Sequence, residues 1–301
     1  MAEPQGAAPT ARARQLADEL RLLRTAAGLH GKDVAQRLGW SASKLSRIEN
    51  GRIGISERDL KRLIELYRIP PQRAAWLRAL APRLSAKGWW DAFSEVVPSG
   101  YANLLKLEAD SWAVQCYCAI VPHALLQTVD YSRAVILAGA RRPSSKDLER
   151  RLDIVRRRQG PLTGSVKDRE PMRLAVVLDE SVILRLTSVR DAAERAVSAG
   201  QISHLISLTT QAHLELRVLS LSVGPPPISS GAFSLLTPFA GTSPDVVCFE
   251  NKSRAFFIEE EREVQSYVQD FERLNAMSLS TADSLKRLKA ALAECRADRG
   301  E

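Results

Sequence analysis

Closely spaced signals for starting and ending helices run through residues 13–80 and restrict this part of the chain to short helices. A first apolar stripe at helical spacing ends at a glycine, and a second, shorter stripe ends at Gly39. Ser41 and Ser56 are suitable N-caps for two more helices, and a Pro-Pro pair starts a fifth. We therefore expect a five-helix, all-α domain in this region.

The net positive charge of the chain comes entirely from its first third. Residues 1–87 hold 17 basic and 8 acidic side chains, which gives +9, whereas residues 88–301 hold 26 and 27, which gives −1 and the total of +8. This asymmetry is typical of a polyanion-binding module joined to a neutral body. A hydrophobic content of 45% with 26% charged residues excludes a wholly disordered chain.

Beyond Gly88 helical and strand patterns follow one another. Apolar runs bounded by turn residues are typical of strands, and a 3.6-residue period is typical of helices. The mixture predicts an α+β domain, and it leaves the order of the strands open. The expected helices cover about 101–113, 130–139, 145–159, 190–211, 260–276 and 281–297, and the expected strands cover 173–178, 214–220, 233–238, 245–250 and 254–259.

Composition also predicts which segments are tail and linker, and in which cellular compartment the protein works. Residues 1–12 are expected to be a mobile tail, and residues 82–87 a linker between the domains 13–81 and 88–301. We expect no membrane segment or exported leader, because no run of about 18 apolar residues occurs. The four cysteines are too few for a disulfide framework, and the Cys-x-Cys pair lacks a second Cys/His pair. Buried free cysteines in a reducing cytoplasm, with no metal and no cofactor, are therefore expected.

Residues 31–52 have the spacing of a helix-turn-helix, with a turn through Gly39 between two short helices. In that arrangement the second helix, about 42–50, enters the major groove of double-stranded DNA. Arg47 suits a guanine edge, and Ser41 with the first N–H groups of its helix suits a phosphate. The alternative is that this surface is only the solvated side of a small bundle, but the spacing and the local charge favour DNA. The candidate DNA-binding residues are Lys32, Ser41, Ser43, Lys44, Ser46, Arg47, Asn50 and Arg52.

The second domain has no arrangement of residues typical of catalysis. Nothing in residues 88–301 combines a nucleophile, a base and an oxyanion donor, so we do not expect an enzyme. Three successive arginines at 156–158 could bind phosphate. They fit the exposed C-terminal end of a helix better, because cations are favoured there.

The motif GWSxSKxSRIExG at 39–51, preceded by the AAGL of residues 26–29, resembles the Xre/Cro-repressor class of helix-turn-helix proteins. The resemblance covers nearly the whole chain from about residue 15. Past the linker, the sequence is similar to actinobacterial, antitoxin-like transcriptional regulators with a DUF5753-type C-terminal domain. The segments that carry this second likeness are 88–90, 107–109, 121–122, 125–128, 130–131 and 177–180.

The resemblance implies a lambda-repressor-like fold and DNA-binding regulation, often with a small partner protein encoded nearby. One small helix-turn-helix covers few base pairs, so a homodimer on a palindromic operator is expected. An alternative is an adaptor that mainly binds such a partner, with DNA binding as autoregulation. Two departures from the family pattern stand out. His30-Gly31 replaces a Ser/Thr-Gln pair near the DNA backbone, so that one phosphate contact could be missing, and His30 could cap the helix or take the place of that contact. Pro225 to Ile228 replaces a His-Pro-Gly.

Overall fold

The computed structural model describes residues 11–50, 53–80, 89–93, 99–139, 142–164, 170–228, 231–238, 245–251 and 255–297. These fall into two compact units, one up to Asp91 and the other from Ala92 onward. The first helix begins at Ala11, slightly earlier than expected. Residues 1–10 of the predicted tail, and the whole predicted linker 82–87, lie outside the described residues.

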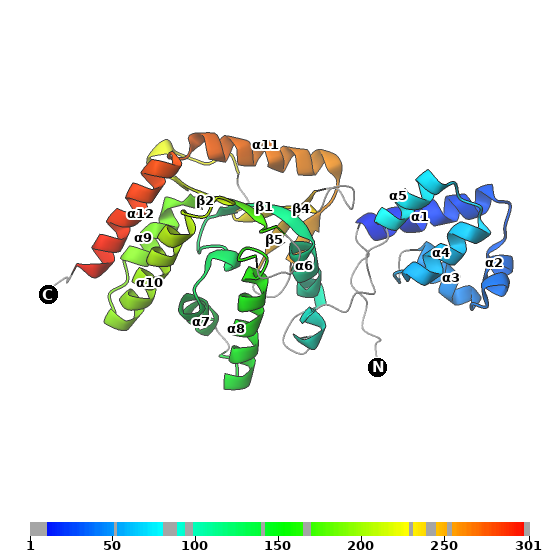
Figure 1. Ribbon diagram of the computed structural model, residues 1–301, viewed down its shortest axis with the longest axis horizontal. Helices are drawn as coiled ribbons and strands as arrows, with labels where there is room; N and C mark the ends of the chain where they lie inside the picture. The colour runs from blue at the N-terminus through cyan, green and yellow to red at the C-terminus, as the bar shows by residue number, and fades with distance from the viewer. Residues whose placement is uncertain are drawn as a thin grey trace. The chain divides into compact units, whose positions relative to one another are not determined.

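The first unit consists of the short helices that the sequence predicts (Figure 1). Gly39 ends the second helix with a left-handed φ of 64°. The Oγ atoms of Ser41 and Ser56 each accept a hydrogen bond, at 3.1 Å, from the backbone N–H three residues later. One apolar cluster, built around Leu20, Leu45 and Leu63, joins the helices. Their bounds are α1 (Ala11–Ala26), α2 (Gly31–Leu38), α3 (Ala42–Glu49), α4 (Glu57–Leu66) and α5 (Pro71–Leu80).

The second unit is built on a mixed six-stranded sheet, which confirms the predicted α+β class. Its strands are β1 (Ser111–Cys118), β2 (Arg173–Asp179), β3 (Leu214–Leu219), β4 (Phe233–Pro238), β5 (Val246–Glu250) and β6 (Ala255–Ile258). They lie in the order β3-β2-β1-β4-β5-β6. The first three strands pair in parallel, and the last three pair antiparallel to their neighbours.

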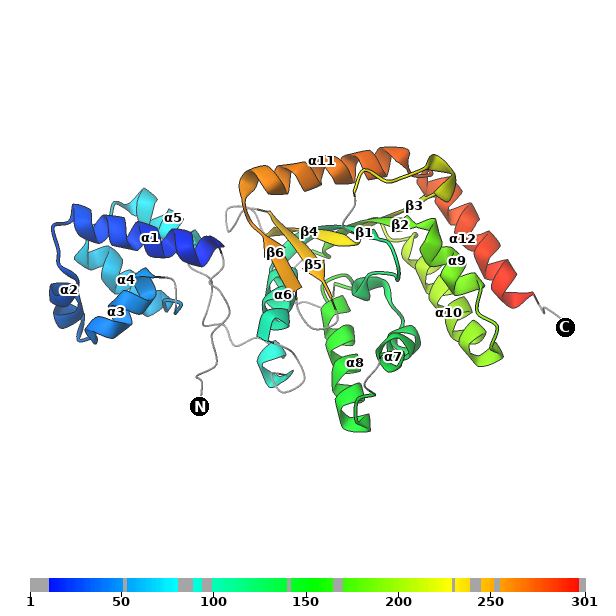
Figure 2. The ribbon, with the colours of Figure 1, turned by 180° about the vertical axis from the view of Figure 1, so that it is seen from behind.

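Helices cover both faces of this sheet. The helix α11 (Glu261–Met277) lies along one face, where Phe271 and Leu274 pack on Val177 and Val247 (Figures 1 and 2). A larger core lies on the opposite face. The helices of the second unit on this side of the sheet are α6 (Ser99–Ala109), α7 (Val129–Leu137), α8 (Ser145–Gln159), α9 (Glu180–Thr187), α10 (Ala192–Leu208) and α12 (Thr281–Arg296) (Figure 1). The described chain also has short 3-10 turns at Trp89–Phe93, Ala124–Leu126 and Leu221–Val223.

Two elements differ from the sequence prediction. The helix expected at 101–113 ends at Ala109, and Ser111 begins β1, which pairs with both β2 and β4. The helix α9 was not predicted, because its apolar residues directly follow the apolar run of β2. The signal that could have found it is Asp179, whose Oδ1 accepts a hydrogen bond from the N–H of Ser181 at 2.9 Å and so caps the helix.

The expectation for the arginine run is wrong at its third member. Arg158 is buried, with 3% of its surface exposed, and it pairs with the carboxylates of Glu108 at 2.8 Å and Glu250 at 3.0 Å. The Tyr101 hydroxyl accepts a hydrogen bond from Arg158 and donates one to Glu250. Burial raises the pKa of Glu250, but the charge and hydrogen bonds of Arg158 outweigh this effect and lower it to about 2. This cluster joins α6, α8 and β5 inside the unit.

The four cysteines are free and buried, as predicted. Cys116 and Cys118 lie on one face of β1, within the larger core. The hydrogen bond with the neighbouring Cys118 thiol and burial raise the pKa of Cys116, so this thiol stays protonated. The cysteines therefore behave as small apolar core residues.

Candidate nucleic-acid interface

The helix α3 separates its buried and exposed residues cleanly. Leu45 and Ile48 are buried in the apolar cluster of the first unit. Ser43, Ser46 and Arg47 are exposed on the other side, as the sequence predicts. Because Ser41 caps the helix and Gly39 ends α2 in a left-handed turn, the start of α3 is held at a defined place relative to α2.

Arg47 is available for binding. Within the described part of the chain, its guanidinium has no hydrogen-bond or ion-pair partner, and the side chain is exposed. A guanidinium presents its donors in a planar fork that matches a guanine edge or a phosphate. The free fork of Arg47 on an exposed, capped helix is the most suitable group here for reading a base.

Lys44 and Asn50 are already engaged within the domain. The Nζ atom of Lys44 lies 2.8 Å from Oδ2 of Asp59 and 4.4 Å from the centre of the Trp40 ring. Burial raises the pKa of Asp59, but hydrogen bonds from Lys44 and Ser56 outweigh it and lower the pKa. The Asn50 amide donates to the carbonyl oxygen of Ser46 at 2.7 Å and to its hydroxyl at 3.2 Å. Lys44 still has further ammonium N–H donors, and Asn50 still has its Oδ1 acceptor, so both can contact DNA only from the positions in which these bonds hold them.

A bidentate ion pair fastens α3 to α1. The Nε and Nη2 atoms of Arg24 lie 2.7 and 3.1 Å from the two carboxylate oxygens of Glu49, and Nη1 donates to the carbonyl oxygen of Leu29 at 2.9 Å. The hydrogen bond with Glu49 and the charge of Glu49 raise the pKa of Arg24 above the ordinary value for arginine. The pair thus fixes the end of α1, the turn before α2 and the last turn of α3. Neither residue was among the candidates predicted from the sequence, although an Arg in the last turn of α1 and a Glu beside Ile48 were visible signals.

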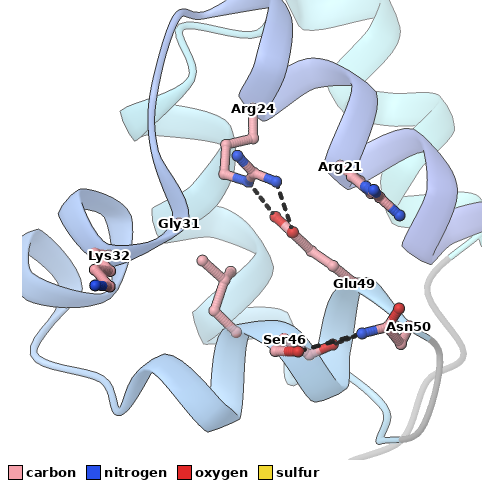
Figure 3. A pocket seen from close by; sticks show the side chains of 8 residues that line it. Arg21, Arg24, Gly31, Lys32, Ser46, Glu49 and Asn50 are labelled. Carbon is pink, nitrogen blue, oxygen red and sulfur yellow. Dashed lines mark hydrogen bonds and ion pairs between the residues drawn. The ribbon is translucent and has the colours of Figure 1, made fainter.

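A cavity of about 430 Å³ lies between α1, α2 and α3 (Figure 3). Three of the predicted residues line it: Ser46 of α3, Asn50 at the C-cap of that helix, and Lys32 of α2. It is also lined by Arg21 of α1, which is not among the residues predicted from the sequence. The complete lining is Arg21, Arg24, Gly31, Lys32, Leu45, Ser46, Glu49 and Asn50.

The start of α2 is not capped by a side chain. His30 occupies the N-cap position, but it makes no side-chain hydrogen bond to the helix. The first expectation for His30, that its side chain caps the helix, is therefore wrong, and the second, that it takes the place of the missing phosphate contact, stays a prediction. Arg52, the last of the candidate residues, lies outside the described residues.

Two further properties concern the whole described chain. No helix within it is both long enough and apolar enough to cross a bilayer. Among its residues, no three or more His, Cys, Asp or Glu side chains are grouped so that they could hold a metal ion.

Each of the two units matches a known protein-domain family. Residues 15–77 match a helix-turn-helix domain family, and residues 101–290, more than half of the chain, match a domain of unknown function, DUF5753. No curated protein and no solved structure matches the chain. The chain therefore belongs to the DUF5753 family and joins that domain to an N-terminal helix-turn-helix domain of the DNA-binding kind.

Proposed function

We propose that the protein is a sequence-specific transcriptional regulator of the Xre type, with α3 in the major groove of its operator. The observation that carries the proposal is the exposed guanidinium of Arg47, which has no partner among the residues that the structure describes, on a helix held by the Arg24–Glu49 pair. A recognition helix must be rigid, because base contacts depend on geometry at the level of single hydrogen bonds. Ser43 and Ser46 add donors and acceptors beside Arg47.

The DUF5753 domain has a different role in this proposal. Residues 88–301 carry a formal charge of −1, so they have no net electrostatic attraction to DNA. We assign to them the contacts of a homodimer and the binding of an effector or a small partner protein, in the cytoplasm. Two copies are needed because one helix-turn-helix reads only a few base pairs. We propose no catalytic role, since the buried charges Arg158 and Glu108 are satisfied by each other.

Selection from a random duplex library tests the proposal, because the library contains every short operator sequence. The wild-type protein should enrich one palindromic sequence. Arg47→Ala should bind that sequence about 5- to 150-fold more weakly, which corresponds to the roughly 1–3 kcal/mol of one bidentate base contact. Its binding to unselected duplex should change much less.

A matched control is Arg78→Ala, which removes an exposed arginine from α5 rather than α3. It should keep wild-type affinity for the selected duplex. The proposal fails if no sequence is enriched, or if Arg47→Ala enriches the same sequence with unchanged affinity.

A further inference from the structure

The strand β6 forms one edge of the six-stranded sheet (Figure 2). Among the described residues, its backbone pairs with β5 on one side and has no partner on the other. The opposite edge, β3, is covered at Val218, whose N–H donates to Oγ of Ser284 and whose carbonyl oxygen accepts from the N–H of Leu279, both at 2.9 Å. An open edge such as β6 presents unpaired N–H and C=O groups with which another strand can pair.

A row of aromatic side chains crosses the α11 face of the sheet and ends at this edge. Tyr117 of β1 lies opposite Phe233 of β4, and Phe249 of β5 lies opposite Phe256 of β6. Tyr267 of α11 packs on the middle of the row, with its ring centre 5.2 Å from that of Phe233 and 5.5 Å from that of Phe249. Phe256 is the last ring of the row, and 53% of its surface is exposed. An uncovered aromatic ring therefore lies at an open edge.

The residues of β6 do not protect this edge against pairing. Sheet edges that stay single commonly carry a charged residue or a proline. The four residues of β6, Ala255–Ile258, include neither. Apolar side chains beside unpaired backbone groups favour the addition of another strand.

The charges around β6 are complementary to a second copy of the same segment. Lys252 and Arg254 precede the strand, and Glu259, Glu260 and Glu261 follow it. In an antiparallel pair of identical strands, the start of each lies beside the end of the other, so basic residues lie beside acidic ones. A parallel pair would instead bring like charges together. Lys252 and Arg254 lie outside the described residues, and the sequence alone gives their charge.

We propose that β6 pairs antiparallel with β6 of a second copy of this chain and joins the two sheets into one. The inference rests on the proposed function, which assigns the contacts of a homodimer to residues 88–301 without placing them. Both copies use the same edge, so the pair closes at two and leaves no β6 edge open. Because β6 is short, we expect a reversible dimer whose population depends on protein concentration.

The symmetry of this pair determines which side chains meet. The two-fold axis is perpendicular to the joined sheet, so each residue lies opposite a residue from the same face of the second copy. In the two registers centred closest to the middle of β6, Phe256 lies opposite Phe256 or Ile258 of the second copy. Either register covers the exposed ring and continues the aromatic row across the dimer.

Sedimentation equilibrium of the full chain without DNA, over about a hundredfold range of protein concentration, tests the inference. The wild-type protein should dimerise. Phe256→Lys should weaken the dimer about tenfold or more, because it removes two symmetry-related apolar contacts and places two like charges close together.

A matched control is Leu221→Lys, which removes an apolar side chain of nearly the same exposure, 54%, from the turn that follows β3. It should leave the dissociation constant of the dimer unchanged. Amide hydrogen exchange of the wild-type protein is a second measurement that needs no variant. Exchange in β6 should slow as the protein concentration rises, whereas exchange at Leu221–Val223 should stay the same.

The outcomes separate this inference from the proposed function. If the wild-type protein dimerises and Phe256→Lys has the same dissociation constant, or if exchange in β6 does not slow, pairing through β6 is overturned and the homodimer stands. If the wild-type protein stays monomeric at every concentration, the inference and the homodimer are both overturned, and the β6 edge is left for a strand of another protein. In each case the selection from a random duplex library still decides the role of α3 independently.

Discussion

The three arginines at the end of α8 have different environments although they are adjacent in the chain. Arg156 and Arg157 are exposed, and Arg157 pairs with Asp153 at 2.9 Å, one turn earlier. Arg158 is rotated by about 100° from its neighbour around the helix and so points toward α6 and β5, where Glu108 and Glu250 meet it. Burial of this charge is possible only because both carboxylates are there.

Replacing Arg158 should therefore cost far more than replacing Arg157. In Arg158→Met, Glu108 keeps a buried charge without its partner, so the free energy of unfolding should fall by about 3–5 kcal/mol. Arg157→Gln removes an exposed i,i+4 pair and a guanidinium that lies 5.3 Å from the centre of the Phe93 ring, and it should cost about 1 kcal/mol or less. Denaturant unfolding of both variants measures the difference. Equal losses would show that the Arg158 cluster contributes no more than a surface pair.

At the scale of elements, two glycines have opposite requirements. Gly39 ends α2 with a φ of 64°, a conformation that an L-residue with a side chain adopts at a cost. Gly200 lies inside α10, in an ordinary helical position. There a glycine only lowers the stability of the helix, because it gives the unfolded chain more conformational entropy to lose on folding. A Cβ atom added at either glycine meets nothing within 4 Å, so sterics with neighbours do not decide the outcome.

The same substitution should thus change stability in opposite directions. Gly39→Ala should lower the free energy of unfolding of the first unit by about 1 kcal/mol or more, whereas Gly200→Ala should raise that of the second unit by about 0.4–1 kcal/mol. Thermal melts followed by circular dichroism measure both. A stabilised Gly39→Ala would contradict the need for a left-handed turn before α3.

At the scale of the whole molecule, the apolar clusters of the two units share no residue. Each unit buries its own core, so each should unfold cooperatively by itself. We expect two transitions in scanning calorimetry. Excess duplex should raise only the midpoint of the helix-turn-helix unit, because a ligand stabilises the unit that binds it. A single transition, or an equal rise of both midpoints, would contradict independent folding.

Features that depend on interactions between residues close together in the chain could be predicted from the sequence. The capping hydrogen bonds of Ser41 and Ser56 span three residues, so the sequence shows donor and acceptor together. The ion pair of Lys44 with Asp59 joins residues 15 apart, and the pair of Arg24 with Glu49 joins residues 25 apart. Neither could be predicted, because the spacing along the chain does not show which faces meet.

By itself, the sequence determined the helices of the first unit, the class of the second, the place of the positive charge, and the exposed face of α3 that carries Arg47. These depend on periodicity, caps and composition, which act over a few residues. Only the tertiary structure decided the order of the sheet, the burial of Arg158, and the pairing of Arg24 with Glu49 between α1 and α3. Each of these requires distant segments to pack, and the packing energy depends on which surfaces meet rather than on either segment alone.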